Sequence, residues 1–225
     1  MSNDLIPIIG GLASAASKEV ESLTKTSDFL PQIRVYGASS DLVKEGKFPM
    51  GHLGMYFTKD NIADLGEAFD CLVIDWRPRT SIVSGDSPIS FYGKFNNETG
   101  EWDCSNEEFQ EVKDLAMKKT KGYLAGLEYL LYVPSIDKFA LFLFGSPTLR
   151  RESANVCALT RKAATIKIHY IKTTQYSWHG VQVFECTTPF DMPSVESITE
   201  EVVKFRSPPQ AQVELDTSEE GKRAR

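Results

Sequence analysis

Short apolar and aromatic runs, each followed by turn-forming residues, recur through the middle of this sequence. Residues 69–76 form one run, and residues 81–83 and 89–92 flank a Gly-Asp-Ser-Pro segment that suits a hairpin turn. Two further runs, 127–133 and 139–144, flank a Pro-Ser-Ile-Asp segment with similar turn chemistry. Runs of about four to eight residues bounded in this way are typical of strands, so the middle of the chain is predicted to form β-sheet.

The remaining patterns add one early strand and a few helices. Residues 32–36 alternate polar and apolar side chains, as a half-buried strand does. A capping box that begins at Ser105 predicts one helix. A second helix is expected over residues 153–164, and a third from near Pro193 to just before Pro208. These patterns predict a β-dominated α+β fold with a few short helices.

The predicted core domain covers residues 29–206, between a flexible N-terminal arm, residues 1–28, and a polar C-terminal tail, residues 207–225. Apolar residues make up 41% of the 225 residues and charged residues 25%, which excludes a disordered or membrane-spanning chain. The apolar residues near the start lack a basic leader, so no signal peptide is predicted and the protein is expected to stay where it is made. The four cysteines form no C-x-x-C pair and are interpreted as reduced thiols.

Catalytic motifs are sparse in the sequence. It contains no phosphate-binding glycine loop and no nucleophile elbow. Glu111 and Lys113 form the acid-x-Lys pair of a metal-dependent nuclease, and an acidic run between Asp64 and Asp75 offers further carboxylates. The pair falls on a predicted amphipathic helix, where such charges usually face solvent. The sequence therefore predicts a non-enzymatic protein without catalytic residues, metal or cofactor, and a nuclease stays open as an alternative.

Charge is unevenly distributed along the chain. The whole sequence has a net charge of −6, but residues 141–186 contain six basic residues and two acids, which gives a local charge of +4. This segment is therefore the candidate surface for a polyanion. The six basic residues are Arg150, Arg151, Arg161, Lys162, Lys167 and Lys172.

Aromatic residues are interleaved with these cations. Residues 164–185 are predicted to form two long strands that carry Tyr170, Tyr176 and Trp178. A sheet face with cations and exposed rings is the arrangement found in single-strand nucleic-acid binders, because cations follow the phosphates and rings accept bases of any identity. The sequence therefore predicts a binding surface for single-stranded nucleic acid on this segment.

Two further cations, Arg77 and Arg79, lie beside Trp76 and are expected to extend the same groove. Aromatic residues also favour strands through packing alone, and a β-sandwich interface uses the same residue types. A structural or assembly role therefore stays open beside nucleic-acid binding.

Several segments resemble phage replication-module proteins, namely residues 139–142, 145–152, 176–180 and 188–191. From Phe29 to Phe205 the chain is broadly similar in pattern to phage single-stranded-DNA-binding proteins of the OB-fold type. The resemblance implies an OB-like antiparallel barrel, single-stranded DNA as ligand, phage replication proteins as partners and the host cell cytoplasm as location. The tail departs from the family pattern, because basic residues after Gly221 nearly cancel its acidic residues.

Residues and resemblance together predict a phage protein that coats single-stranded DNA during replication or recombination, without strong sequence preference. Further copies of the chain are candidate partners through formation of a homo-oligomer, whereas no membrane association is expected. The first alternative is a phage virion or assembly protein, a β-rich module whose arms exchange between subunits. The second alternative is the metal-dependent nuclease.

Overall fold

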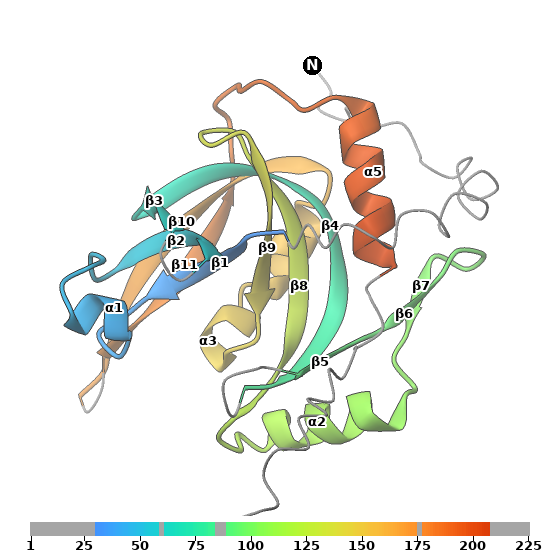
Figure 1. Ribbon diagram of the computed structural model, residues 1–225, viewed down its shortest axis with the longest axis horizontal. Helices are drawn as coiled ribbons and strands as arrows, with labels where there is room; N and C mark the ends of the chain where they lie inside the picture. Colours follow the sequence, from blue (N-terminus) through green and yellow to red (C-terminus); the bar gives the residue numbers. More distant parts are fainter. Residues whose placement is uncertain (1–29, 59–60, 84–88, 175–176, 208–225) are drawn as a thin grey trace, which may run out of the picture.

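The computed structural model describes residues 30–58, 61–83, 89–174 and 177–207 (Figure 1). Strands dominate this part of the chain, and a nine-stranded sheet has the order β11-β10-β4-β8-β9-β1-β2-β3, with β5 beside β4. The strands of this sheet are β1 Gln32–Tyr36, β2 His52–Thr58, β3 Asn61–Gly66, β4 Ala68–Ile82, β5 Ile89–Tyr92, β8 Tyr123–Val133, β9 Lys138–Phe144, β10 Lys162–Lys172 and β11 Ser177–Glu185. A separate pair is formed by β6 Lys94–Asn96 and β7 Glu101–Asp103. The helices are α1 Asp41–Lys44, α2 Glu107–Met117, α3 Pro147–Arg150, α4 Ser153–Ala158 and α5 Val195–Arg206.

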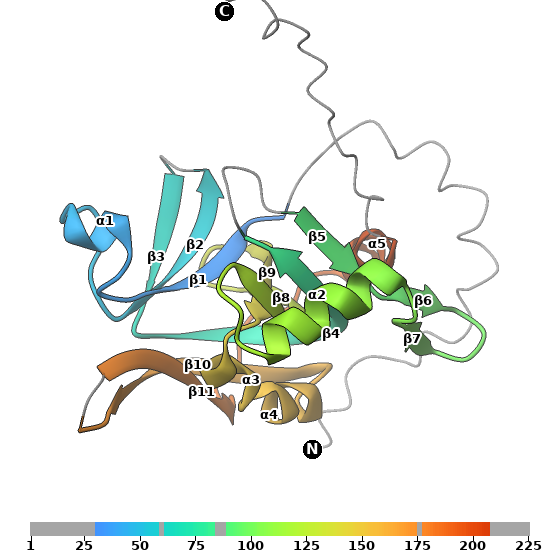
Figure 2. The same cartoon turned by 90° about the horizontal axis from the view of Figure 1, so that it is seen from below.

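The large sheet curls into a half-barrel (Figures 1 and 2). Its longest strand, β4, pairs with β10 along its first part and with β8 from Leu72 onward. The register with β8 shifts between Val73 and Asp75, and a bulge of this kind bends a strand and increases its twist. The β-dominated α+β class is thus confirmed. The sequence predicts an antiparallel barrel. The observed sheet differs in one respect, because β1 and β9 pair in parallel at Gln32 and Leu141.

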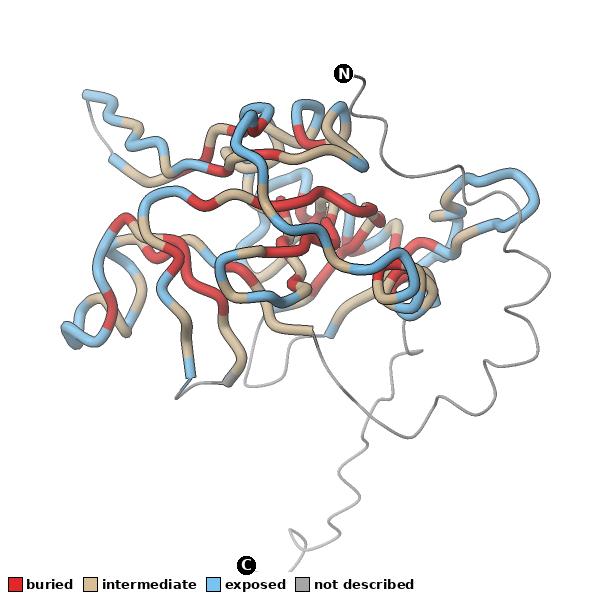
Figure 3. The backbone as a smooth tube through the Cα atoms, turned by 90° about the horizontal axis from the view of Figure 1, so that it is seen from above, coloured by how far each residue is buried: buried red, intermediate tan, exposed pale blue. Residues whose placement is uncertain are grey.

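Apolar clusters lie on both faces of this sheet. The larger one contains Tyr129 and Phe144, whose ring centroids are 5.0 Å apart in an edge-to-face arrangement. The smaller one lies beneath α5, which buries Ile198, Val202 and Phe205 against the other face. Figure 3 shows buried residues concentrated in the central strands. The hairpin of β10 and β11 lies with α3 and α4 on the side opposite α2 and α5 (Figure 2).

The strand predicted over residues 69–76 does not end there, because β4 continues through Pro78 to Ile82. A proline lacks the N–H that a strand interior normally needs, so a strand is not expected to continue through Pro78. The structure tolerates it because β4 pairs with β10 only as far as Val73 and with β5 only from Arg79. Pro78 therefore lies where one side of β4 has no neighbouring strand among the described residues.

The helix predictions are corrected at their ends. The N-cap of α2 is Asn106 rather than Ser105, since Asn106 Oδ1 accepts the backbone N–H of Phe109 at 3.0 Å. The helix expected over residues 153–164 is only the short α4, because from Lys162 onward the chain pairs with β4 as strand β10. The expected third helix is confirmed as α5.

The locally encoded strands are confirmed. Residues 32–36 form β1, and β8 and β9 form an antiparallel hairpin around the predicted turn. β4 and β5 also pair antiparallel, but the turn predicted between them, residues 85–88, lies outside the described residues. The expected N-terminal arm, residues 1–28, and all but the first residue of the expected tail, residues 207–225, lie outside the described residues. None of the helices in the described part of the chain has the length and apolar character needed to cross a lipid bilayer.

Candidate functional site

The predicted basic segment forms the hairpin of β10 and β11, which stays in register over nine residue pairs. β10 also pairs with β4, but only as far as Lys167 opposite Ala68. Beyond that point the hairpin extends as a two-stranded ribbon at one end of the sheet (Figure 1). On this ribbon His169, Tyr170, Lys172 and Ser177 are exposed, whereas Trp178 and His179 are half-buried.

Five of the predicted cations lie along this hairpin or in the segment that leads to it, and we call them the cation track. None of them forms an ion pair with another described residue. All except the half-buried Lys162 are exposed. A strand rises about 3.3 Å per residue, so the track covers about 33 Å between Lys162 and Lys172. The members of the cation track are Arg151, Arg161, Lys162, Lys167 and Lys172.

The predicted aromatic residues are split between the two faces of the hairpin. Tyr170 is 54% exposed, and its ring centroid lies 5.1 Å from that of His179, the residue opposite it on β11. Because side chains alternate along a strand, Lys172 shares this face. Trp178 is half-buried and lies opposite Ile171, on the other face. The predicted Tyr176 lies outside the described residues.

Arg150 does not belong to the cation track. Its Nη1 donates to the backbone carbonyl of Ala125 at 3.2 Å and lies 3.1 Å from Met117 Sδ. These contacts hold the guanidinium against β8 and the end of α2, away from the hairpin. The prediction that Arg150 lies on the same surface as the other cations is therefore corrected.

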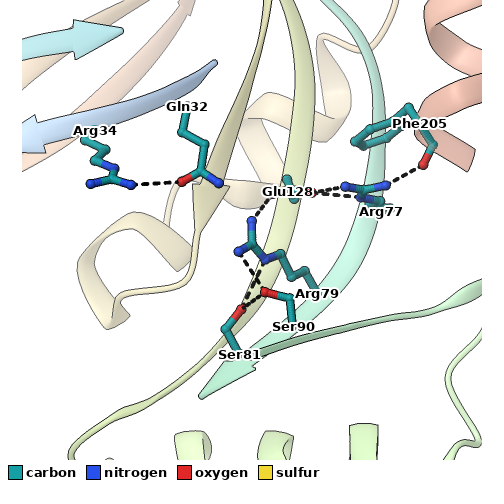
Figure 4. A network of polar contacts seen from close by, with 8 residues as sticks. All are labelled: Gln32, Arg34, Arg77, Arg79, Ser81, Ser90, Glu128 and Phe205. Atoms are coloured by element: carbon teal, nitrogen blue, oxygen red, sulfur yellow. Dashed lines mark hydrogen bonds and ion pairs between the residues drawn. The ribbon is translucent and has the colours of Figure 1, made fainter. Parts of the chain in front are cut away.

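Arg77 and Arg79 are also placed differently from the prediction. Both are buried on the face of the sheet that α5 covers (Figure 4). Glu128, whose side chain is fully buried, accepts hydrogen bonds from Arg77 Nε at 2.8 Å and from Arg79 Nη1. Arg77 Nη1 also donates to the carbonyl of Phe205 at the end of α5, at 2.6 Å. A buried charge must be paired and hydrogen-bonded, so these two cations hold the sheet together instead of extending the hairpin surface.

Arg79 differs from Arg77 in facing a cleft. Its Nε donates to Ser81 Oγ at 3.1 Å, and its Nη2 donates to Ser90 Oγ at 2.9 Å. Burial opposes the charged form of Arg79, but the neighbouring carboxylate of Glu128 outweighs this and raises the pKa of Arg79. Arg79 therefore stays a cation at all physiological pH values.

The cleft has a volume of about 1100 Å³ and lies where β1 and β9 diverge after their one parallel pairing. Its walls come from β1, β4, β8 and β9 on one side and from the hairpin and α3 on the other. Hairpin residues Tyr170 and Trp178 line it, so the cleft is continuous with the surface that carries the cation track. The polar and aromatic residues that line it are Gln32, Arg34, Ser39, Tyr56, Arg79, Ser81, Glu128, Phe142, Ser146, Tyr170, Ser177, Trp178 and His179.

Sequence reasoning missed the cleft residues on β1 and β2. Arg34 is exposed, donates to Gln32 Oε1 at 3.3 Å, and lies over the ring of Tyr56 at 4.1 Å. The alternation in residues 32–36 does place Gln32 and Arg34 on one face. It does not reveal that β4 and β8, distant in sequence, present polar side chains to the same cleft. The sequence does not indicate a role for Glu128, because it is an isolated acid in an apolar run.

The residues of the nuclease alternative are not brought together. Glu111 and Lys113 lie on α2. Asp75 lies on β4, where it accepts a hydrogen bond from Arg206 Nε at 2.6 Å, and Asp64 accepts one from His52 at 3.0 Å. Among the described residues, no three His, Cys, Asp or Glu side chains gather as a metal site requires.

Comparisons of the chain with protein-family models, with curated proteins and with solved structures find no match. The functional argument therefore depends on the residues and their geometry.

Proposed function

We propose that this protein binds single-stranded DNA along the hairpin of β10 and β11, as a non-enzymatic phage protein of replication or recombination. The observation that carries the proposal is the cation track, because its five cations have no ion-pair partner among the described residues and extend from the segment that leads to β10 to the far end of that strand. In an acidic chain such a surface attracts a polyanion through release of its counterions. The likeness to OB-type single-stranded-DNA-binding proteins is part of this proposal.

Aromatic stacking supports the choice of a single strand over a duplex. Tyr170 presents half of its side chain to solvent on the projecting hairpin, close to Lys172. The bases of a single strand are free to stack on such a ring, whereas in a duplex they are stacked on one another. The separation of cations over about 33 Å fits an extended strand better than a compact ligand.

The test is a titration of the full chain with labelled oligo-dT at several salt concentrations. Each phosphate that is neutralised releases about 0.7 counterion. If all five track cations contact phosphates, a plot of log K against log salt has a slope of about −3.5, and fewer contacts make it shallower. The variant Lys172→Gln should make that slope less steep by about 0.7. Lys138 is an exposed lysine on β9, and Lys138→Gln should leave the slope unchanged. No binding at low salt, or binding that is independent of salt, would contradict the proposal and favour the virion or assembly alternative.

Stacking is tested with a second pair of variants. Tyr170→Ala should weaken oligo-dT binding by about 1–3 kcal/mol with little change in thermal stability, because the side chain is largely exposed. Phe184→Ala is the matched control, since Phe184 is an equally exposed aromatic residue outside the predicted set. Equal losses for both variants would show that general apolar contact, not stacking at Tyr170, contributes to binding.

A further inference from the structure

The cleft between β1, β9 and the hairpin has an excess of positive charge. Arg34 and Arg79 both line it, and Glu128 is the one acid among its described lining residues. Both oxygens of Glu128 already accept hydrogen bonds from Arg77 and Arg79. Two arginines and one carboxylate leave one positive charge in the buried network, and Arg34 adds a second at the edge of the cleft.

Unused hydrogen-bond donors accompany this charge. An arginine has five N–H groups. Arg79 uses three of them, on Ser81, Ser90 and Glu128, and Arg34 uses one, on Gln32. Both arginines line the cleft, and in the view of Figure 4 the amide of Gln32 lies between their guanidinium groups. Guanidinium donors without a free carboxylate nearby are suited to a phosphate group, which accepts several N–H bonds at once.

Aromatic rings complete the wall of the cleft. Tyr56, Tyr170 and Trp178 line it together with the two arginines. The buried Nε1–H of Trp178 finds no acceptor among the described residues, and a buried donor without an acceptor is costly. A planar ligand with polar edges offers both a ring face for stacking and an acceptor for such a donor.

We propose that this cleft binds the phosphate monoester of a nucleotide. The phosphate contacts Arg34 and Arg79, and the base lies against one of the aromatic rings that line the cleft. Two sources supply this chemistry, a free mononucleotide and the phosphorylated end of a DNA strand. The second source rests on the proposed function, because the strand would then enter the cleft from the cation track.

The test compares small ligands by calorimetry with the full chain. Thymidine 5′-monophosphate should bind at least about tenfold more tightly than thymidine, since only the former carries the phosphate. Arg34→Gln should lower the affinity for the monophosphate about tenfold, and Arg34→Lys should restore part of it by returning the charge without the fork of donors. Because Arg34 is exposed, these variants should fold, and Lys138→Gln is the control for loss of one surface charge. Equal affinity for nucleotide and nucleoside, or an unchanged Arg34→Gln variant, overturns the proposal.

Oligo-dT with and without a 5′-phosphate separates the two sources. Tighter binding of the phosphorylated oligonucleotide, lost in Arg34→Gln, assigns the cleft to strand ends, and equal binding of both assigns it to the free nucleotide. The two proposals also fail separately. Salt-sensitive oligo-dT binding without discrimination of the monophosphate overturns the cleft proposal alone, whereas monophosphate binding without oligo-dT binding overturns the proposed function alone.

Discussion

Replacing Glu128 by glutamine should strongly destabilise the fold. Glu128 is fully buried on β8, and its carboxylate is the shared partner of Arg77 and Arg79, whose side chains are 6% and 10% exposed. Glutamine has almost the same shape, so Glu128→Gln leaves the packing nearly unchanged, but it removes the negative charge and replaces one accepting oxygen by an N–H donor. The variant therefore leaves two buried guanidinium groups without a counter-charge.

The expected loss follows from the cost of an uncompensated buried charge. Removing one partner of a buried ion pair typically costs about 3–5 kcal/mol. For a domain of this size each kcal/mol shifts the melting temperature by about 2–4 °C, so the melting temperature should fall by about 6–20 °C. Phe205 and Tyr92 offset part of the loss, because the Phe205 carbonyl accepts from Arg77 and the Tyr92 ring lies 4.0 Å from the guanidinium carbon of Arg77.

Urea unfolding measures this loss, with Glu200→Gln as the control. Glu200 pairs with Lys204 on the surface of α5 at 2.9 Å, with both side chains well exposed, so its replacement should cost at most about 1 kcal/mol. A triple variant that replaces Arg77 and Arg79 by methionine and Glu128 by leucine should recover most of the stability, because no buried charge remains. A loss for Glu128→Gln as small as that for Glu200→Gln would refute the reasoning.

Further outcomes are expected from other parts of the molecule. Gly126→Ala should cost at least about 1–3 kcal/mol in urea unfolding, because an added Cβ would overlap the backbone carbonyl of Phe144. The free energy of unfolding should fall as pH rises from about 10 to about 12, since burial and then the hydrogen bond to Asp137 raise the pKa of Tyr132 to about 12. That fall should be smaller in Tyr132→Phe, measured by pH-dependent melting. Magnesium or manganese should produce no cleavage of labelled DNA, and cleavage that is lost in Glu111→Ala would overturn the non-enzymatic proposal.

The strands were predictable because their signals are local. The alternation of residues 32–36 and the turn residues between neighbouring runs are sufficient to place β1 and the hairpins β4–β5 and β8–β9. The continuation of β4 through Pro78 was not predictable, because the effect of a proline depends on which strand lies beside it and the sequence does not give the order of the sheet. The same reason explains the helix expected over residues 153–164, whose last part is held in β10 by pairing with β4.

The candidate site was less predictable, because the availability of a cation depends on partners far along the chain. Arg77 and Arg79 stand on either side of a proline beside an aromatic residue, and this local pattern indicates an exposed turn. Their partner Glu128 is 51 and 49 residues away, on a strand that the sequence does not align with β4. Local charge density therefore overestimates the surface that a ligand can use.

This difference is measurable in the salt dependence of binding. The sequence assigns eight cations to the binding surface, and if each of them neutralised a phosphate, at about 0.7 counterion each, the slope would be about −5.6. The structure places Arg77 and Arg79 in buried ion pairs and holds Arg150 against β8, which leaves the five cations of the track and a slope of at most about −3.5. A measured slope near −5.6 would mean that the buried network opens or that other cations join the interface. A slope near −3.5 that loses about 0.7 in Lys172→Gln is the result expected if the hairpin alone tracks the phosphates.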